Sequence, residues 1–321
     1  MKEYVMGVRN NYNLLDLGKF IASIGIVALH VFPLSDQCTI GFIHQILGFS
    51  TSLCVPYFFA VSAFLFFNRN GVSCWKRLLN FMKRISILYF LWWSIHLVIT
   101  RDFSIFSNFS FSSLFQTFGG SWFYVSLVTS TVLVMILARV NEWLMIVISA
   151  LVYAYFVACN EGFVYNVLYT WCINHTNGWF LSFPYAIVFT AIGYILSLKN
   201  DGKIIKLIVI DSLIVILFIV AGKTLFLDAI TWIGRLISIE FLMIFTISPI
   251  CSVNLPYRSL RALSVLIFMT HFYYFTSIHS SMTIGWLNLD FVFVLLLSIL
   301  TSLTLLWLSK RSYGKIIQYL Y

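Results

Sequence analysis

The chain has few charged residues. Only 10% of its 321 residues are Asp, Glu, Lys or Arg, whereas 61% are hydrophobic. A soluble domain carries about 25% charged residues, so this chain cannot cover a soluble surface with polar groups. The composition therefore excludes a soluble globular protein and predicts a polytopic membrane protein.

Cysteine motifs, repeats and a secretion signal are also lacking. The six cysteines include no CxxC pair and no Cys/His cluster at zinc spacing, so no metal site is predicted. Cys159 and Cys172 could form a disulfide in one outer loop, although separate free thiols are the favoured interpretation. No small-residue cleavage site follows the first apolar run, which argues against a cleavable signal peptide. Without an internal repeat, we expect one domain over residues 1–321.

Long apolar runs are abundant. Runs of about 20 apolar residues can cross a bilayer as helices. We predict an all-α protein with ten such spans, at residues 14–34, 44–67, 82–100, 122–138, 143–159, 178–198, 204–221, 229–248, 260–279 and 288–308.

The cations are distributed unevenly between the two sides of these spans. If the N-terminus is inside, every Lys and Arg falls in an inner segment except Arg101, Lys223 and Arg235. Because Lys and Arg gather in cytoplasmic loops, we predict that both termini are cytoplasmic. The same bias accounts for the net charge of +9, so no nucleic-acid partner is predicted.

Three ionisable residues lie on the first span. Asp16 and Lys19 are three residues apart and can pair on a helix surface. Lys19 and His30 are eleven residues apart, so on a helix they share one face at a separation of about 16 Å. An ionisable group at membrane depth usually lines a polar cavity or meets a substrate, which makes His30 a catalytic candidate. The alternative is a histidine that only hydrogen-bonds a neighbouring helix.

A basic inner loop precedes the third span and carries Lys76, Arg77, Lys83 and Arg84. These cations can bind lipid head groups or the phosphates of a soluble donor. Arg77 and Arg84 suit phosphate best, because a guanidinium can bind it through two prongs.

Other candidates are scattered over the later spans. Gly119-Gly120-Ser121-Trp122 opens the fourth span at the outer face, where Trp suits a membrane interface or a sugar. The remaining ionisable residues within spans are Asp211, Arg235, Glu240 and His271, for which structural pairing between helices is the default interpretation.

Together these residues resemble the membrane-bound acyltransferase-3 family, bacterial enzymes that O-acylate sugars of surface polysaccharides and related acceptors. The resemblance covers nearly the whole chain. Its motifs are Leu15-Asp16-x-x-Lys19 followed by His30, Val55-Pro56-Tyr-Phe-Phe-x-Val-Ser62-Ala63-Phe64, the basic stretch Lys76–Arg84, Trp122-Phe-Tyr and Thr270-His271-Phe. The family commonly has Arg in place of Lys19 and Gly in place of Ala63.

The resemblance implies a multi-pass enzyme of the bacterial inner membrane. Acetyl-CoA would be the cytoplasmic acyl donor, and a hydroxyl of a glycan would be the acceptor. The enzyme would contain no bound cofactor and would contact membrane lipid. His30, with Lys19 and Asp16 nearby, would be the general base or a transient acyl carrier, since imidazole exchanges protons near neutral pH. Donor phosphates would bind Arg77, Lys83 and Arg84, while Trp122, Glu240 and His271 would support the site or the acceptor.

Two other functions fit the same residues. A glycan or solute exporter could relay protons through His30, Glu240 and His271. The sequence supports it less, because no inverted repeat or matched pair of broken helices is evident. A relative of the acyltransferases that has lost catalysis is the third possibility.

Overall fold

The structure is a computed structural model that describes residues 12–35, 40–68, 73–101, 119–160, 167–176, 182–198, 202–221, 226–248, 255–278, 282–311 and 317–321. Almost all of these residues lie in α-helices. The predicted all-α fold is therefore confirmed for the described parts of the chain.

The helices follow one another along the chain with short connections. The first half contains α1 (Asn13–His30), α2 (Gly41–Ser52), α3 (Cys54–Phe67), α4 (Cys74–Thr100), α6 (Ser121–Val140) and α7 (Glu142–Asn160). The second half contains α8 (Val167–Thr176), α9 (Phe183–Ser197), α10 (Lys203–Ala221), α11 (Phe226–Ile247), α12 (Tyr257–Phe275) and α13 (Leu289–Ser309). A small antiparallel hairpin of β1 (Thr283–Ile284) and β2 (Leu287–Asn288) precedes α13.

Within the described residues, six helical stretches are long and apolar enough to cross a membrane. They are Asn13–His30, Gly41–Phe67, Trp75–Thr100, Ser121–Val140, Glu142–Asn160 and Leu289–Ser309. Large apolar side chains such as Leu296, Leu300 and Leu303 also face outward, which suits contact with lipid. These features indicate a membrane protein. A helix lies at each of the ten predicted spans, while the number that cross the bilayer stays a prediction.

The predicted second span, 44–67, is not one continuous helix. It consists of α2 and α3, separated by a turn at Leu53. Pro56 accounts for the break, because its nitrogen has no hydrogen to donate to the carbonyl of Ser52.

The predicted third span, 82–100, begins too late. α4 starts at Cys74, where the hydroxyl of Ser73 accepts a hydrogen bond from the backbone N–H of Lys76 at 3.3 Å. Such a cap satisfies an amide that has no partner within the helix. The stretch from Lys76 to Arg84, expected as a loop, is therefore helical.

Two smaller differences concern the middle of the chain. α9 covers only Phe183–Ser197 of the predicted span 178–198, of which residues 178–181 lie outside the described residues. α8 occupies a stretch expected to be a loop. Cys159 is a free thiol, and the side chain of Cys172 lies outside the described residues.

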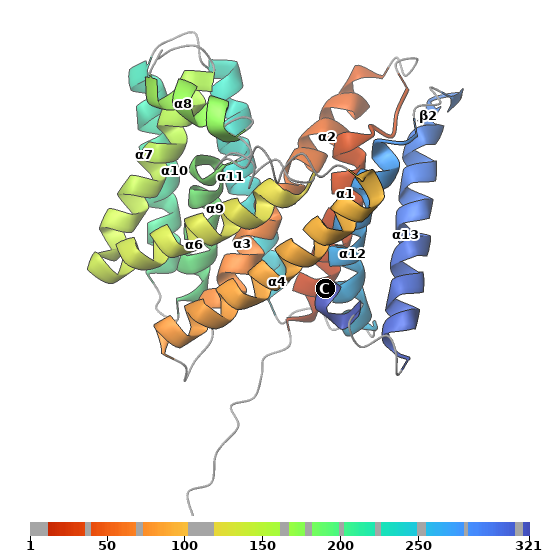
Figure 1. The fold of residues 1–321 in the computed structure, drawn as a ribbon. Coiled ribbons are helices and arrows are strands. Elements are labelled where there is room, and N and C mark those ends of the chain that lie inside the picture. Colours follow the sequence, from red (N-terminus) through yellow and green to blue (C-terminus); the bar gives the residue numbers. More distant parts are fainter. Residues whose placement is uncertain are drawn as a thin grey trace, which may run out of the picture.

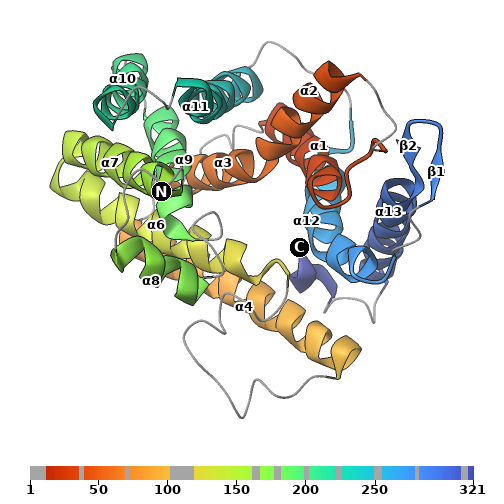
Figure 2. The same cartoon turned by 90° about the horizontal axis from the view of Figure 1, so that it is seen from above.

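The helices form two groups that meet at α3. Seen from above, α1, α12 and α13 lie on one side and α7, α9, α10 and α11 on the other, with α3 between them (Figure 2). α3 packs on both α1 and α9, and Phe59, Phe64 and Phe189 are buried in this central core. α3 thus connects the group that carries His30 to the rest of the bundle.

A glycine allows α3 and α9 to approach closely. A Cβ at Gly193 of α9 would clash with the carbonyl oxygen of Ala60 and would lie 2.8 Å from the Cβ of Ala63. Small residues of this kind let membrane helices pack backbone against backbone, which is a main source of their association.

We expect Gly193→Ala to lower the free energy of unfolding by about 1–3 kcal/mol, because the added methyl group must push the two helices apart. The measurement is the melting temperature of the purified protein in detergent. Gly48→Ala in α2 is the matched control, since nothing lies within 4 Å of a Cβ there. Equal melting temperatures for Gly193→Ala and the wild type would contradict the close packing.

Candidate functional site

Helices α1 and α12 lie side by side and run in the same direction (Figure 1). They touch near both ends. Asp16 contacts Arg261 near the start of the two helices, and His30 contacts His271 near their ends. The pair therefore carries ionic groups at one end and two imidazoles at the other.

Asp16 connects the two helices at the first end. It is only 3% exposed and accepts hydrogen bonds from Arg261 through both carboxylate oxygens, at 2.9 Å from Nε and 2.5 Å from Nη2. Lys19 Nζ lies 2.8 Å from Asp16 Oδ1, so the predicted pairing of Asp16 with Lys19 is confirmed. A two-pronged contact between carboxylate and guanidinium fixes direction as well as distance, so Asp16 sets how α12 lies on α1.

Positive charge is in excess at this end. Arg84 of α4 lies within electrostatic reach of Lys19 and of Tyr124. Lys19 and Arg261 both contact the carboxylate of Asp16, and Arg84 adds a third positive charge near Lys19. We call Asp16, Lys19, Arg84 and Arg261 the cation cluster. Concentrated charge of one sign attracts anions, and guanidinium groups bind phosphate well.

The side chain of Tyr57 reaches this region from α3. A Cβ at Gly18 of α1 would clash with the Tyr57 hydroxyl and lie 2.9 Å from its ring carbon Cζ. The glycine thus allows α3 to pack directly behind the cation cluster, and it brings the central core against α1.

His30 is the last residue of α1, and its side chain is exposed. The sequence predicted a span that continues to residue 34, with His30 buried inside it. The helix instead ends at His30 and leaves the imidazole exposed at the helix end. The ring centroid of His30 lies 5.2 Å from that of His271, 4.9 Å from Phe272 and 5.5 Å from Phe275. We call these four residues the histidine site.

His271 is fully buried beneath His30. Its Nδ1 lies 3.2 Å from the carbonyl oxygen of Ile267. A carbonyl only accepts hydrogen bonds, so we assign the ring hydrogen to Nδ1. Nε2 then carries the lone pair, and it has no hydrogen-bond partner among the described residues. The buried imidazole is therefore available as an acceptor.

Backbone hydrogen bonds hold the chain directly after His30. The amide of Ser35 donates to the carbonyl of Trp286 at 2.8 Å, and the amide of Asn288 donates to the carbonyl of Pro33 at 2.9 Å. The side chain of Asn288 also donates to the carbonyl of Phe32 at 3.0 Å. The hairpin before α13 thus fixes the end of α1.

The start of α6 closes against the histidine site. A Cβ at Gly119 would clash with the ring of Phe272, so the glycine permits a contact that no other residue allows. Trp122 is half-buried, with its ring centroid 6.3 Å from that of Phe59. Trp122 therefore packs on the central aromatic core next to the site.

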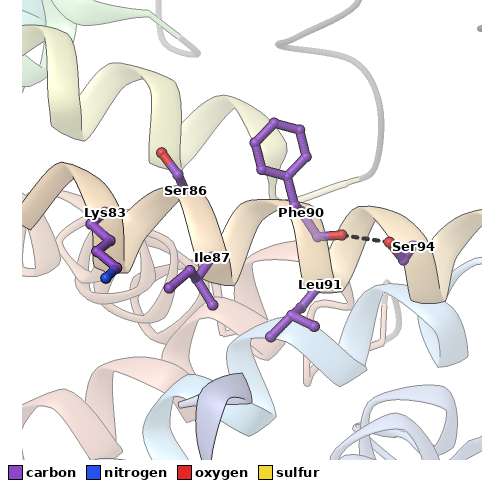
Figure 3. A pocket seen from close by; sticks show the side chains of 6 residues that line it. All are labelled: Lys83, Ser86, Ile87, Phe90, Leu91 and Ser94. Carbon is purple, nitrogen blue, oxygen red and sulfur yellow. Dashed lines mark hydrogen bonds between the residues drawn. The ribbon is translucent and has the colours of Figure 1, made fainter. Parts of the chain in front are cut away.

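The three predicted donor-binding residues lie in different surroundings. Arg77 donates hydrogen bonds to the carbonyls of Phe66 and Phe67 at 3.2 and 3.0 Å, at the end of α3. Arg84 belongs to the cation cluster. Lys83 is exposed at one end of a shallow groove along α4 of about 420 Å³, which is lined further by Ser86, Ile87, Phe90, Leu91 and Ser94 (Figure 3).

Glu240 lies apart from the histidines. It lies on α11 with 8% of its surface exposed, and the neighbouring charged group is Asp211 of α10. The ion pairs of the described residues do not join it to Arg235, whose guanidinium instead lies over the ring of Trp232 at 4.3 Å. The structure therefore does not bring Glu240 together with His30.

Arg261 is the residue that sequence analysis missed, because it was counted only as a cytoplasmic charge. A spacing could have indicated it. A cation precedes a histidine by eleven residues in α1, from Lys19 to His30, and by ten residues in α12, from Arg261 to His271. Two parallel helices with the same pattern bring like groups together at each end.

Comparison of the chain with protein-family models, with curated proteins and with solved structures gave no match. The resemblance to the acyltransferase-3 family therefore stays a prediction from the residues.

The contact between Asp16 and Arg261 makes a prediction about coupling. Asp16→Asn and Arg261→Gln should each lower the free energy of unfolding by about 1–3 kcal/mol, because each removes the two-pronged contact between a buried carboxylate and the guanidinium. The double variant should lower the free energy of unfolding by little more than either single variant does, since both substitutions remove the same interaction. Thermal unfolding in detergent measures all three.

Arg258→Gln is the control for that cycle, because Arg258 is an exposed cation of the same helix outside the cation cluster. It should leave the melting temperature unchanged. Additive losses in the double variant would contradict the direct contact.

Proposed function

We propose that the protein is a membrane-embedded O-acyltransferase. It transfers an acyl group, with acetyl-CoA as the first donor to test, to a hydroxyl of a surface polysaccharide or its lipid-linked precursor. The observation that carries this proposal is the pairing of α1 with α12, which places the cation cluster and the histidine site at opposite ends of one helix pair.

The separation of the two ends selects the kind of donor. Lys19 and His30 are eleven residues apart on one helix, which is about 16 Å. A donor held by its phosphates at the cation cluster needs a long, thin arm to present its acyl group at His30. Coenzyme A has this form, with phosphates at one end and the thioester at the tip of a pantetheine arm.

The chemistry at His30 is a proton transfer coupled to acyl transfer. His30 accepts the proton of the acceptor hydroxyl while the oxygen attacks the thioester carbonyl. The carbon–sulfur bond then breaks, and His30 returns the proton to the leaving thiolate. Its exposed position leaves room for both substrates. In the variant of this route with an acyl carrier, the His30 nitrogen attacks the thioester carbonyl first, and coenzyme A leaves as its thiolate. The acceptor hydroxyl then attacks the acyl carbon, the bond to the His30 nitrogen breaks, and the hydroxyl proton passes through the freed imidazole to the thiolate.

His271 serves as a positioning residue in this proposal. Its bond to Ile267 fixes the tautomer, and its free Nε2 can accept a hydrogen bond from the acceptor hydroxyl or from protonated His30. Phe272 and Phe275 form an apolar wall that limits water near His30. Exclusion of water also protects an acyl group from hydrolysis.

We further propose that ten helical segments cross the bacterial inner membrane with both termini in the cytoplasm. The support is the charge bias, since Lys19, Arg84 and Arg261 all lie at the predicted inner ends of their spans. The cation cluster would then face the compartment that contains acetyl-CoA. His30 would lie toward the outer side, where a glycan is accessible.

His30→Ala should lower transfer of labelled acetyl groups into alkali-labile glycan by about 10²–10⁴-fold, because the base is lost. The assay uses isolated membranes at matched protein abundance. His44→Ala is the control, since His44 lies stacked on Phe32, 5.0 Å away, outside the site. Retained transfer in His30→Ala would refute its role. No transfer by the wild type with any acyl-CoA, when the glycan is present, would favour an exporter.

Arg84→Ala should raise the KM for acetyl-CoA about tenfold at nearly constant kcat, because a hydrogen bond to a charged group contributes about 1.5–3 kcal/mol. Arg77→Ala makes the matched comparison. Its guanidinium is bonded to carbonyls of α3, so its loss should lower abundance and leave KM unchanged. A raised KM in Arg77→Ala alone would reverse the assignment of the two arginines.

A further inference from the structure

The two imidazoles of the histidine site are in contact with each other and have lone pairs to offer. No hydrogen bond joins His30 to another described residue, and Nε2 of His271 has no partner among them. A fully buried polar atom without a partner is rare, and a bound ion is one explanation for it. Neutral imidazole is also the commonest metal ligand in proteins. The pair therefore suits a ligand that accepts electron pairs.

The hydrogen bond of His271 is the kind that metal-binding histidines make. Its Nδ1 donates to the carbonyl of Ile267, one helical turn earlier on α12. Histidines that bind a metal through one ring nitrogen almost always donate the other to a carboxylate, a carbonyl or water, because that bond fixes the ring and the tautomer. Nε2 of His271 is thus the ligating atom, on a side chain that is fully buried and held in place.

The separation of the rings fits a single tetrahedral ion. A zinc–nitrogen bond is about 2.0–2.1 Å long, and the ring centre lies about 1.1 Å behind the nitrogen. At a tetrahedral angle of about 109°, two imidazoles on one zinc ion place their ring centres about 5.2 Å apart. The centroids of His30 and His271 are 5.2 Å apart. Rotation of the exposed His30 ring about its Cβ–Cγ bond turns a nitrogen toward His271 and hardly moves the centroid.

Both histidines belong to elements whose positions are fixed. The contact of Asp16 with Arg261 sets how α12 lies on α1. The amide of Ser35 donates to the carbonyl of Trp286, which holds the chain directly after His30. Ligands on rigid elements keep their geometry before the ion arrives, so little conformational freedom is lost on binding.

The ligand atoms also select the class of metal. Oxygen ligands suit Mg²⁺ and Ca²⁺, whereas imidazole suits Zn²⁺, Cu²⁺ and Ni²⁺. No group of three or more His, Cys, Asp or Glu within the described part of the chain could hold a metal, so water would complete the coordination. Two protein ligands hold an ion less firmly than the four of a structural zinc site. The site is therefore suited to an ion that exchanges.

We propose that His30 and His271 bind a Zn²⁺ ion that inhibits the protein reversibly. Each imidazole donates the lone pair of one nitrogen, and His271 keeps its ring hydrogen on Nδ1. The bound nitrogen of His30 can then no longer accept the proton of an acceptor hydroxyl. The binding of the ion stands on the contact between the imidazoles, and only its inhibitory effect rests on the proposed acyltransferase function.

Titration calorimetry with Zn²⁺ tests the binding, on protein purified in detergent without a histidine tag. The wild type should bind one ion per chain. His30→Ala and His271→Gln should each weaken binding by about tenfold or more, because each removes a ligand. His30→Cys should restore part of the affinity, since a thiolate also binds zinc. His44→Ala is the control, because His44 stacks on Phe32 outside the site, and its affinity should match the wild type.

Wild-type affinity in His30→Ala, or in a His271→Gln variant that melts like the wild type, would overturn the proposal. A second measurement needs no substitution. Zn²⁺ should slow the modification of His30 by diethyl pyrocarbonate several-fold, as read by mass spectrometry, and should leave His44 unaffected. Equal modification of His30 with and without Zn²⁺ would also overturn the site.

The acetyl-transfer assay separates the metal site from the proposed function. Zn²⁺ should lower transfer by isolated membranes, a chelator should restore it, and Mg²⁺ at the same concentration should have no effect. Full transfer at saturating Zn²⁺ would overturn the inhibitory role. If Zn²⁺ binds as expected while no variant transfers acetyl groups, the metal site stands and the acyltransferase function fails. If transfer occurs but Zn²⁺ neither binds nor protects His30, the metal site fails and the function stands.

Discussion

A carboxylate buried in a membrane helix must have its charge compensated, and the arrangement of α1 and α12 follows from that requirement at Asp16. Two cations share it, one from its own helix and one from α12. The two-pronged contact with Arg261 fixes the helices in parallel and in register. Because helices are stiff, the same register brings His30 over His271 at the far end of the pair. The histidine site therefore depends on an ion pair several turns away.

The stiffness of the pair also restricts the chemistry that the protein can support. The cations and the imidazoles cannot act on the same atom of a substrate. A small anion would reach only one of the two ends, whereas an extended donor can use both. The geometry thus links two features that lie at opposite ends of one helix pair: the ion pair and the imidazoles.

Local features of this fold could be predicted from the sequence, and tertiary ones could not. Apolar runs indicated the positions of the helices, and the spacing of three residues indicated the pairing of Asp16 with Lys19, because both signals lie within one helix. Hydropathy placed the start of α4 too late, since polar residues extend a helix beyond its apolar stretch. Arg261 is 245 positions from Asp16 in the sequence, so its contact with Asp16 is visible only once α12 packs on α1. The bond of Arg77 to the end of α3 is of the same kind.

The ion pair within α1 has a consequence for how the protein is made. A lone Asp or Lys raises the cost of inserting a span, by about 2.5–3.5 kcal/mol at its centre, and Asp16 and Lys19 lie near the start of α1. Asp16 and Lys19 neutralise each other as soon as α1 forms, so the first helix can enter the bilayer before any partner exists. Arg261 is synthesised after most of the chain, and its contact with Asp16 then docks α12 on α1. Asp16 thus pairs first with Lys19 during insertion and later with Arg261 during helix packing.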